Sequence, residues 1–119
     1  MPVPAARPTV SQHFGKCEPQ VRLIYDAILH ASRSLGSVVE DPNKSSIHLK
    51  RKTAFAGVTA RKSALILTLK SETDLPAARI HKRERVSANR WHLEVRLESP
   101  GDVDRQLKGW LAKAYEISG

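Results

Sequence analysis

The chain has 119 residues, of which 40% are hydrophobic and 27% charged, and its formal net charge is +8 at neutral pH. A chain of this length folds as one domain and needs no metal or disulfide to hold it together, and its composition is not that of a disordered chain. With one cysteine, Cys17, and no apolar segment of membrane-spanning length, the sequence excludes an internal disulfide and a membrane helix and favours a reducing cytoplasm.

The positive charge is concentrated in the middle of the chain. Residues 44–96 contain thirteen Lys or Arg and four Asp or Glu, a net charge of +9, whereas the rest of the chain sums to −1. Such a field attracts polyanions, of which nucleic acid backbones are the commonest. The alternative is that the charge only keeps a sheet soluble and protects its edges from pairing.

The N-terminal part of the chain predicts an arm followed by a helix. Residues 1–12 contain three of the seven prolines and no apolar periodicity, so we expect a flexible arm and then one domain over residues 13–119. A helix is predicted from about Pro19 to Leu35, with Gly36 as its stop. Its apolar residues recur at intervals of three and four, at Val21, Ile24, Ile28, Ala31 and Leu35.

The stretch Ser45–Lys70 predicts an antiparallel meander at the centre of a sheet. A short strand over 38–40 and a turn over 41–43 precede it. Within the last run of the meander, alternation directs its leucines to the core and Ile66 to the other side of the sheet. Pairs of cations separate the three apolar or alternating runs, which are 47–49, 53–58 and 64–69.

The C-terminal half predicts two more strands and a second helix. Residues 72–78 have loop composition, residues 80–86 suit a charged edge strand, and residues 91–97 alternate strictly between apolar and polar. Ser99 and Asp102 form a capping-box-like start for the last helix. The predicted fold class is α+β, an antiparallel sheet of about five strands with an N-terminal and a C-terminal helix packed on one face.

Several motifs in order resemble a known family. They are His48 within SSIHL, the run 53–58, Trp91-His92 before an alternating strand, and 102–104 leading to Trp110-Leu111 and Ala114-Tyr115. From about His13 to Ile117 the chain resembles a bacterial domain-of-unknown-function family, number 5655, whose members occur alone or as a module at the end of longer chains. The resemblance implies no established activity. More distantly, the order of elements is similar to the MmcQ/YjbR family, which has been suggested to bind DNA.

The side of the predicted sheet away from the helices is the best candidate for a site. Two histidines and a carboxylate on it, His48, His92 and Glu94, are weak candidates for proton transfer or metal binding, although no HxH or HExxH spacing supports them. The alternative is solvated surface histidines, and we expect no metal and no cofactor. The predicted outward residues are His48, Lys50, Thr68, Lys70, His92, Glu94 and Arg96.

If the protein binds a nucleic acid, its cationic side chains would contact the phosphates and would not recognise the bases. Phe55, Trp91 and Trp110 are predicted to lie in the core, so stacking on bases has little support, and duplex or backbone recognition fits better. Cys17 beside Lys16 is interpreted as a structural cysteine rather than a reactive one. The predicted phosphate contacts are Lys50, Arg51, Lys52, Arg61, Lys62, Lys82, Arg83, Arg85 and Arg90.

Three functions remain open from the sequence. The leading hypothesis is a small non-enzymatic binding module that engages nucleic acid or another polyanion through its basic sheet. The second is a protein-interaction or oligomerisation domain that pairs with a protein partner or a second copy through a sheet edge or the apolar surface around Ile66. The third is an enzyme of unknown reaction that uses His48, His92 and Glu94. No membrane partner is expected.

Overall fold

The computed structural model describes residues 8–119. Within them the chain forms six strands, three α-helices and one turn of 3₁₀-helix. The elements follow one another in the order α1 (Val10–Phe14), α2 (Pro19–Arg33), β1 (Val39–Pro42), β2 (Ile47–Lys50), β3 (Ala54–Ala60), β4 (Leu65–Ser71), β5 (Ile80–Ser87), β6 (Arg90–Leu97), η1 (Pro100–Asp102) and α3 (Arg105–Glu116).

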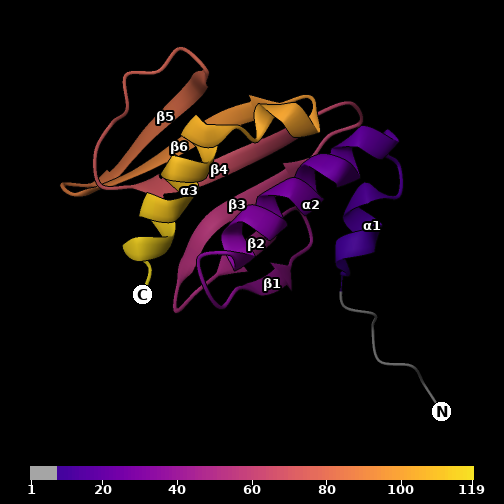
Figure 1. The fold of residues 1–119 in the computed structure, drawn as a ribbon, viewed down its shortest axis with the longest axis horizontal. Coiled ribbons are helices and arrows are strands. Elements are labelled where there is room, and N and C mark those ends of the chain that lie inside the picture. Colours follow the sequence, from indigo (N-terminus) through magenta and orange to yellow (C-terminus); the bar gives the residue numbers. More distant parts are fainter. Residues whose placement is uncertain (1–7) are drawn as a thin grey trace.

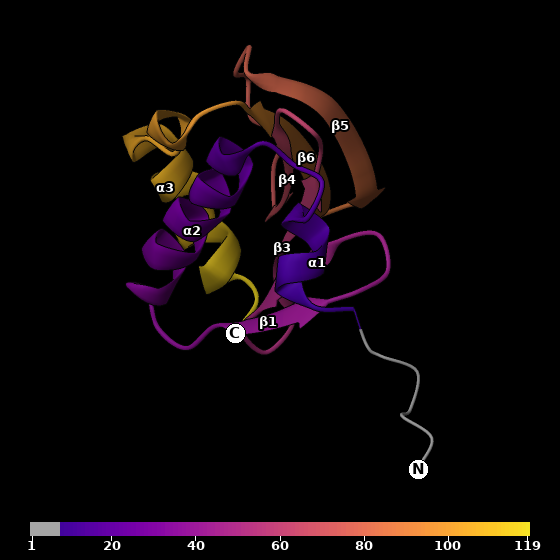
Figure 2. The same ribbon diagram turned by 90° about the vertical axis from the view of Figure 1, so that its right-hand side faces the viewer.

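All six strands belong to one antiparallel sheet in the order β1-β2-β3-β4-β6-β5. Consecutive strands pair directly, except that β6 lies between β4 and β5 (Figure 1). Figure 2 shows α2 and α3 on one side of the sheet, and no helix of residues 8–119 covers the other side, which we call the open face. Among the helices of residues 8–119, none is long and apolar enough to cross a bilayer.

The central strands β4 and β6 carry the core. Their alternation places one set of side chains under the helices and the other set on the open face, as a period of two requires. Three inward pairs of the β4–β6 register are apolar and buried, and a one-residue slip would put charged side chains against the helices. These pairs are Leu65 with Leu97, Leu67 with Val95, and Leu69 with Leu93.

A bulge in β3 adds an aromatic side chain to this core. The register with β2 shifts so that Leu49 pairs with Ala56 and Lys50 pairs with Ala54, which leaves Phe55 as the extra residue. In a bulge of this kind two successive side chains can lie on the same side of the sheet. Phe55 and Ala56 are therefore both buried, and the Phe55 ring meets the edge of the Tyr115 ring from α3 at 5.3 Å between centroids.

The connection from α2 to β1 is hydrogen-bonded to a side chain of α3. Gly36, which follows α2, has φ +150°, a conformation that side chains disfavour. A Cβ added there would lie 2.5 Å from the hydroxyl oxygen of Tyr115, which donates a hydrogen bond to the Ser37 carbonyl at 2.9 Å. Glycine is required at this position for both reasons, and the contact joins the two covering helices at one end of the sheet.

The predicted α+β class and the placement of both helices on one face are confirmed. The sheet has six strands where about five were expected, because the short β1 and the charged β5 both pair at the edges. β1 continues through Pro42, so the turn predicted over 41–43 begins only at Asn43. Proline is tolerated there because β1 is an edge strand, in which a missing amide donor can face solvent.

Helix α1 overlaps the end of the predicted arm, residues 1–12, and continues to Phe14. It begins at Val10, after Thr9, which forms a capping box with Gln12: each side chain bonds the other's backbone amide. Its last residue, Phe14, is buried against the Tyr25 ring at 5.1 Å between centroids. The rest of the predicted arm, residues 1–7, lies outside the described residues.

We expect opposite effects from adding a methyl group at two glycines. Gly36→Ala should lower the free energy of unfolding by about 2 kcal/mol, because it combines an unfavourable φ with a clash against Tyr115. Gly109→Ala, in α3 with no atom within 4 Å of the added carbon, should raise it by about 0.5–1 kcal/mol. Urea denaturation followed by circular dichroism measures both. A neutral Gly36→Ala variant would contradict this account of the α2–β1 connection.

Candidate functional site

A row of outward side chains crosses the open face from β2 to β5. His48 on β2 pairs with Gly57 on β3, and Gly57 pairs with Thr68 on β4. Thr68 pairs with Glu94 on β6, and Glu94 pairs with Lys82 on β5. The row therefore has a glycine and a threonine in its middle and larger polar side chains at both ends, so the open face is lower over β3 and β4.

A hollow of about 290 Å³ lies at this low point. Gly57 contributes no side chain, and a Cβ added to it would meet only the His48 ring at 3.7 Å and Thr68 at 3.8 Å. The floor is thus backbone and small side chains, while larger basic groups stand around it. The hollow is lined by Ser46, His48, Ala54, Phe55, Ala56, Gly57, Thr59, Thr68, Lys70 and His92.

The turn after β1 orients the His48 ring. The Asn43 side-chain amide nitrogen lies 3.4 Å from His48 Nδ1, and Nε2 of His13 in α1 lies 2.7 Å from the Asn43 carbonyl oxygen. Because an amide nitrogen can only donate, Nδ1 accepts in this contact and a neutral ring carries its proton on Nε2. Cδ2, which is bonded to Nε2, is the ring atom beside Gly57. This edge of His48 therefore offers a donor to the hollow.

Lys70 lines the hollow and Arg90 lies near Lys70, and neither has a carboxylate partner among residues 8–119. Burial and the nearby Arg90 lower the pKa of the Lys70 ammonium. Lys70 Nζ donates to Thr53 Oγ1 at 3.0 Å, and Arg90 donates only to the Asn89 carbonyl among the described residues. Since no Asp or Glu of residues 8–119 pairs with either of them, a bound anion would supply their missing countercharge.

Lys50, beside the hollow on β2, is already neutralised. Its Nζ lies 2.7 Å from Oδ2 of Asp41, and this hydrogen bond lowers the pKa of the Asp41 carboxyl. Asp41 pairs with His48 in the register, and Glu84 pairs with His92, so carboxylates are present on the open face as well as cations. The basic end of the open face is the part where cations exceed carboxylates, and it consists of Lys50, Lys52, Lys70 and Arg90.

The three candidate catalytic residues share the open face but do not converge. Two strands separate Glu94 from His48, which is about 14 Å at ordinary strand spacing. Glu94 instead contacts His81 Nε2 at 3.8 Å and Lys82 Nζ at 3.5 Å, whereas His48 and His92 line the hollow. Within residues 8–119 no three His, Cys, Asp or Glu residues are placed to hold a metal ion.

Arg51 is used to hold the C-terminal end of α3. Its guanidinium lies 4.5 Å from the centre of the Tyr115 ring and donates to the Tyr115 carbonyl at 3.1 Å. The backbone amides of Lys52 and Thr53 donate to the Ser118 carbonyl in the same place. The adjacent Lys52 side chain is exposed, so of this predicted pair only Lys52 is free to bind a phosphate.

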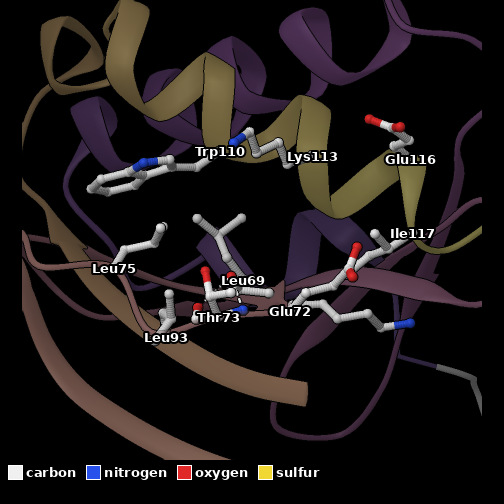
Figure 3. A pocket seen from close by; sticks show the side chains of 11 residues that line it. Leu69, Glu72, Thr73, Leu75, Leu93, Trp110, Lys113, Glu116 and Ile117 are labelled. Carbon is white, nitrogen blue, oxygen red and sulfur yellow. Dashed lines mark hydrogen bonds between the residues drawn. The ribbon is translucent and has the colours of Figure 1, made fainter. Parts of the chain in front are cut away.

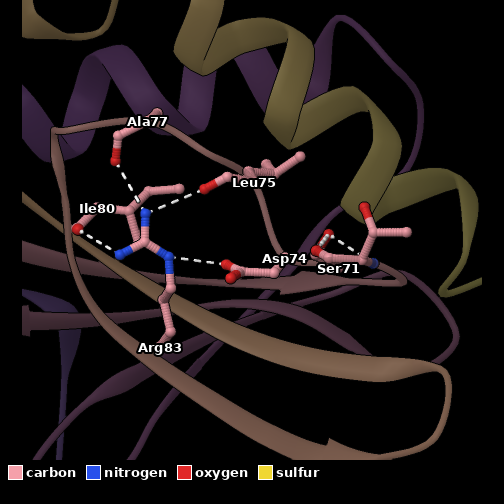
Figure 4. Close-up of polar contacts among 7 residues, drawn as sticks. Ser71, Asp74, Leu75, Ala77, Ile80 and Arg83 are labelled. Atoms are coloured by element: carbon pink, nitrogen blue, oxygen red, sulfur yellow. Dashed lines mark hydrogen bonds and ion pairs between the residues drawn. The ribbon is translucent and has the colours of Figure 1, made fainter.

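Arg83 is likewise used inside the fold, on the helix side of β5 (Figure 4). Its Nε donates to Asp74 at 2.7 Å, and its other nitrogens donate to the carbonyls of Leu75, Ala77 and Ile80. The guanidinium thus organises the connection between β4 and β5.

The other predicted cations are distributed over both faces and both ends of the sheet. Arg85 lies on the helix side, with its guanidinium 5.9 Å from the ring centre of its register partner Trp91. Arg61 and Lys62 lie in the β3–β4 turn, at the end of the sheet opposite the β2–β3 turn. The Lys62 carbonyl accepts from the Glu18 amide at the start of α2. Of the nine predicted phosphate contacts, the open face or its basic end carries Lys50, Lys52, Lys82 and Arg90.

Sequence reasoning missed three contributors to this surface. Gly57 was not identified as the floor of a hollow, although a glycine inside an alternating strand is a signal of close approach or missing bulk. Asn43 was assigned only to a turn, and its contact with His48 depends on the register. His81 lies beside Lys82 because the register of β5 shifts between Ile80 and Lys82, and no sequence pattern indicates that shift.

We expect Arg51 and Lys52 to differ in their effect on stability. Arg51→Met should lower the free energy of unfolding by about 1–2 kcal/mol, because it removes a hydrogen bond to a helix end and a cation–π contact. Lys52→Met should change it by less than about 0.5 kcal/mol. Equal effects in urea denaturation would contradict the assignment of Arg51 to the fold rather than to binding.

Comparison with known proteins identifies the family and little else. A family described as Domain of unknown function (DUF5655) matches residues 10–118, a range that includes every helix and strand described above. Among curated proteins and among solved structures there is no significant match. The similarity to the MmcQ/YjbR family stays a prediction. The match covers nearly the whole chain, so the protein belongs to the DUF5655 family.

Proposed function

We propose that this protein is a binding module that holds the phosphate backbone of a nucleic acid on the open face of its sheet. One phosphate occupies the hollow over Gly57, and the adjacent phosphates follow the basic end. The observation that carries the proposal is the pairing of an uncovered hollow with two unneutralised cations, Lys70 and Arg90. Charge alone would not support it, because several other cations of the chain are bound within the fold.

The groups around the hollow suit an anion. The Nε2 edge of His48 and the ammonium of Lys70 stand on different sides of a floor that is open to backbone-sized groups. Charge-assisted hydrogen bonds of this kind are stronger than neutral ones. An anion would also offset the repulsion between Lys70 and Arg90, which with burial lowers the pKa of Lys70.

The surroundings favour recognition of the backbone over recognition of bases. Phe55 is buried, and Trp91 faces the helix side of the sheet. Within residues 8–119 the open face presents no Phe, Tyr or Trp ring on which bases could stack, so affinity would come from phosphate contacts and would depend strongly on salt. The distant similarity to MmcQ/YjbR proteins and the cytoplasmic location expected from the single cysteine agree with such a partner.

The alternative of self-association has weaker support. Ile66 is only half-exposed and stands between Thr59 and Arg96 in the register. The outer edge of β5 is lined by charged side chains, and β1 at the other edge is short and contains Pro42. These are features that oppose edge-to-edge pairing of sheets.

Two matched double variants test the proposal. Lys70→Gln with Arg90→Gln should weaken binding of a fluorescently labelled DNA duplex about tenfold or more and reduce the salt slope of log K by about 2. Arg105→Gln with Lys108→Gln, which removes the same two charges from exposed positions of α3, should weaken it less than about threefold. Fluorescence anisotropy at about 50 mM and about 200 mM salt gives both quantities. Equal losses in the two variants would reject the open face as the site, and no binding at the lower salt would reject the function.

The hollow is tested separately by filling it. Gly57→Val places a β-branched side chain where Gly57 has only ordinary contacts, so the fold should be retained or slightly stabilised. Its affinity for the same duplex should fall about fivefold or more, because a phosphate could no longer approach the floor. Thermal unfolding serves as the control for folding. A variant that is folded and binds like the wild type would contradict a phosphate in the hollow.

A further inference from the structure

A second cavity, of about 320 Å³, lies on the helix side of the sheet (Figure 3). Its floor is Leu69 of β4 and Leu93 of β6, which face each other in the register. Trp110 of α3 and Ile117, which directly follows α3, form one wall, and Leu75 of the β4–β5 connection forms the end. The leucines of its floor point away from the open face, so this cavity lies on the other side of the sheet from the hollow, and Lys70 of β4 lines both.

The β4–β5 connection, which closes the end of the cavity, is held in place by hydrogen bonds. Arg83 donates to Asp74 at 2.7 Å and to the Leu75 carbonyl at 3.1 Å. Ser71 Oγ donates to the Thr73 carbonyl at 2.6 Å and accepts from the Thr73 amide at 3.3 Å. The connection therefore does not need to fold around a ligand, and the cavity is preformed, as small-molecule sites usually are.

The mouth of this cavity carries charges of both signs. Lys113 and Glu116 come from α3, while Glu72 follows β4 on the other side of the opening. Among residues 8–119 none of these three side chains forms an ion pair. Unpaired charges of both signs at the mouth of an apolar cavity are complementary to a molecule that is both zwitterionic and apolar.

We propose that the cavity binds a free α-amino acid with an apolar side chain. The side chain lies over Leu69 and Leu93 beside Trp110, the carboxylate contacts Lys113, and the ammonium contacts Glu72. The volume is near the lower limit of about 300–1,000 Å³ for small-molecule pockets, which fits a ligand of this size. A longer apolar chain would extend beyond the walls, and a polar side chain would lose its hydrogen bonds on the leucine floor.

Titrations with L-phenylalanine and two analogues test this proposal. 3-Phenylpropionate lacks the ammonium, and 2-phenylethylamine lacks the carboxylate. Amide and indole resonances followed by NMR should show L-phenylalanine bound about tenfold more tightly than either analogue. The resonances that move should be those of Leu69, Leu93 and the Trp110 indole. Equal affinity for all three compounds, or shifts confined to other residues, would overturn the assignment.

Charge variants at the mouth provide the matched comparison. Lys113→Met and Glu72→Gln should each weaken binding of L-phenylalanine about fivefold or more. Lys113→Met should affect 3-phenylpropionate, which keeps the carboxylate, more than 2-phenylethylamine. Glu72→Gln should affect 2-phenylethylamine, which keeps the ammonium, more than 3-phenylpropionate. Lys108→Met and Glu98→Gln remove the same charges at exposed positions outside the cavity and should have no effect. Because these side chains are exposed, folding is preserved.

The Arg90→Gln variant should bind L-phenylalanine normally, so failure here and failure of nucleic acid binding are distinguishable. Unchanged affinity in both mouth variants would overturn the proposal.

Discussion

The register between β4 and β6 is the constraint on which the rest of the structure depends. Three inward pairs of these strands, from Leu65 to Leu69 on β4, are apolar and buried, and each outward pair contains a polar or charged residue, as in Thr68 with Glu94 and Lys70 with His92. Buried apolar area stabilises this register, because the alternative would bury cations under α2 and α3 without partners. Once it is fixed, Leu69 must face the helices and Lys70 must face the open side. Both candidate sites are therefore consequences of the alternation that makes the core.

Much of this architecture was predictable from the sequence, because it depends on periodicity. The alternation of 91–97, the runs of the meander and the apolar spacing of α2 all specify a face as well as an element. Helix α1 was missed because five residues give no periodic signal, although Thr9 and Gln12 do form a capping box. The extent of β1 was missed because Pro42 indicates a turn unless its strand is known to be at an edge.

The candidate site was less predictable, because charges acquire partners only through the tertiary structure. Arg51 and Arg83 are indistinguishable by sequence from Lys52 and Arg90, yet the first two are bound to helix and loop carbonyls. The hollow likewise depends on which residues stand opposite Gly57, and that follows from strand pairing and not from local pattern. A count of positive charge in residues 44–96 therefore overestimates the number of cations available to a ligand. Positions that serve the fold should be subtracted before a basic region is interpreted as a binding surface.

The two sites use neighbouring residues of one strand, which raises the question of whether one could influence the other. Coupling between sites requires an element with two discrete arrangements that the ligands bind differently. β4 lies in the interior of the sheet, paired on both sides over most of its length, and its leucines are buried. A shift of β4 would break the register with β3 and β6 together. In the part of the chain that the structure describes, this strand is thus a rigid wall between two compartments. Any influence of one site on the other would therefore act through Lys70, which lines both, and not through a movement of the strand.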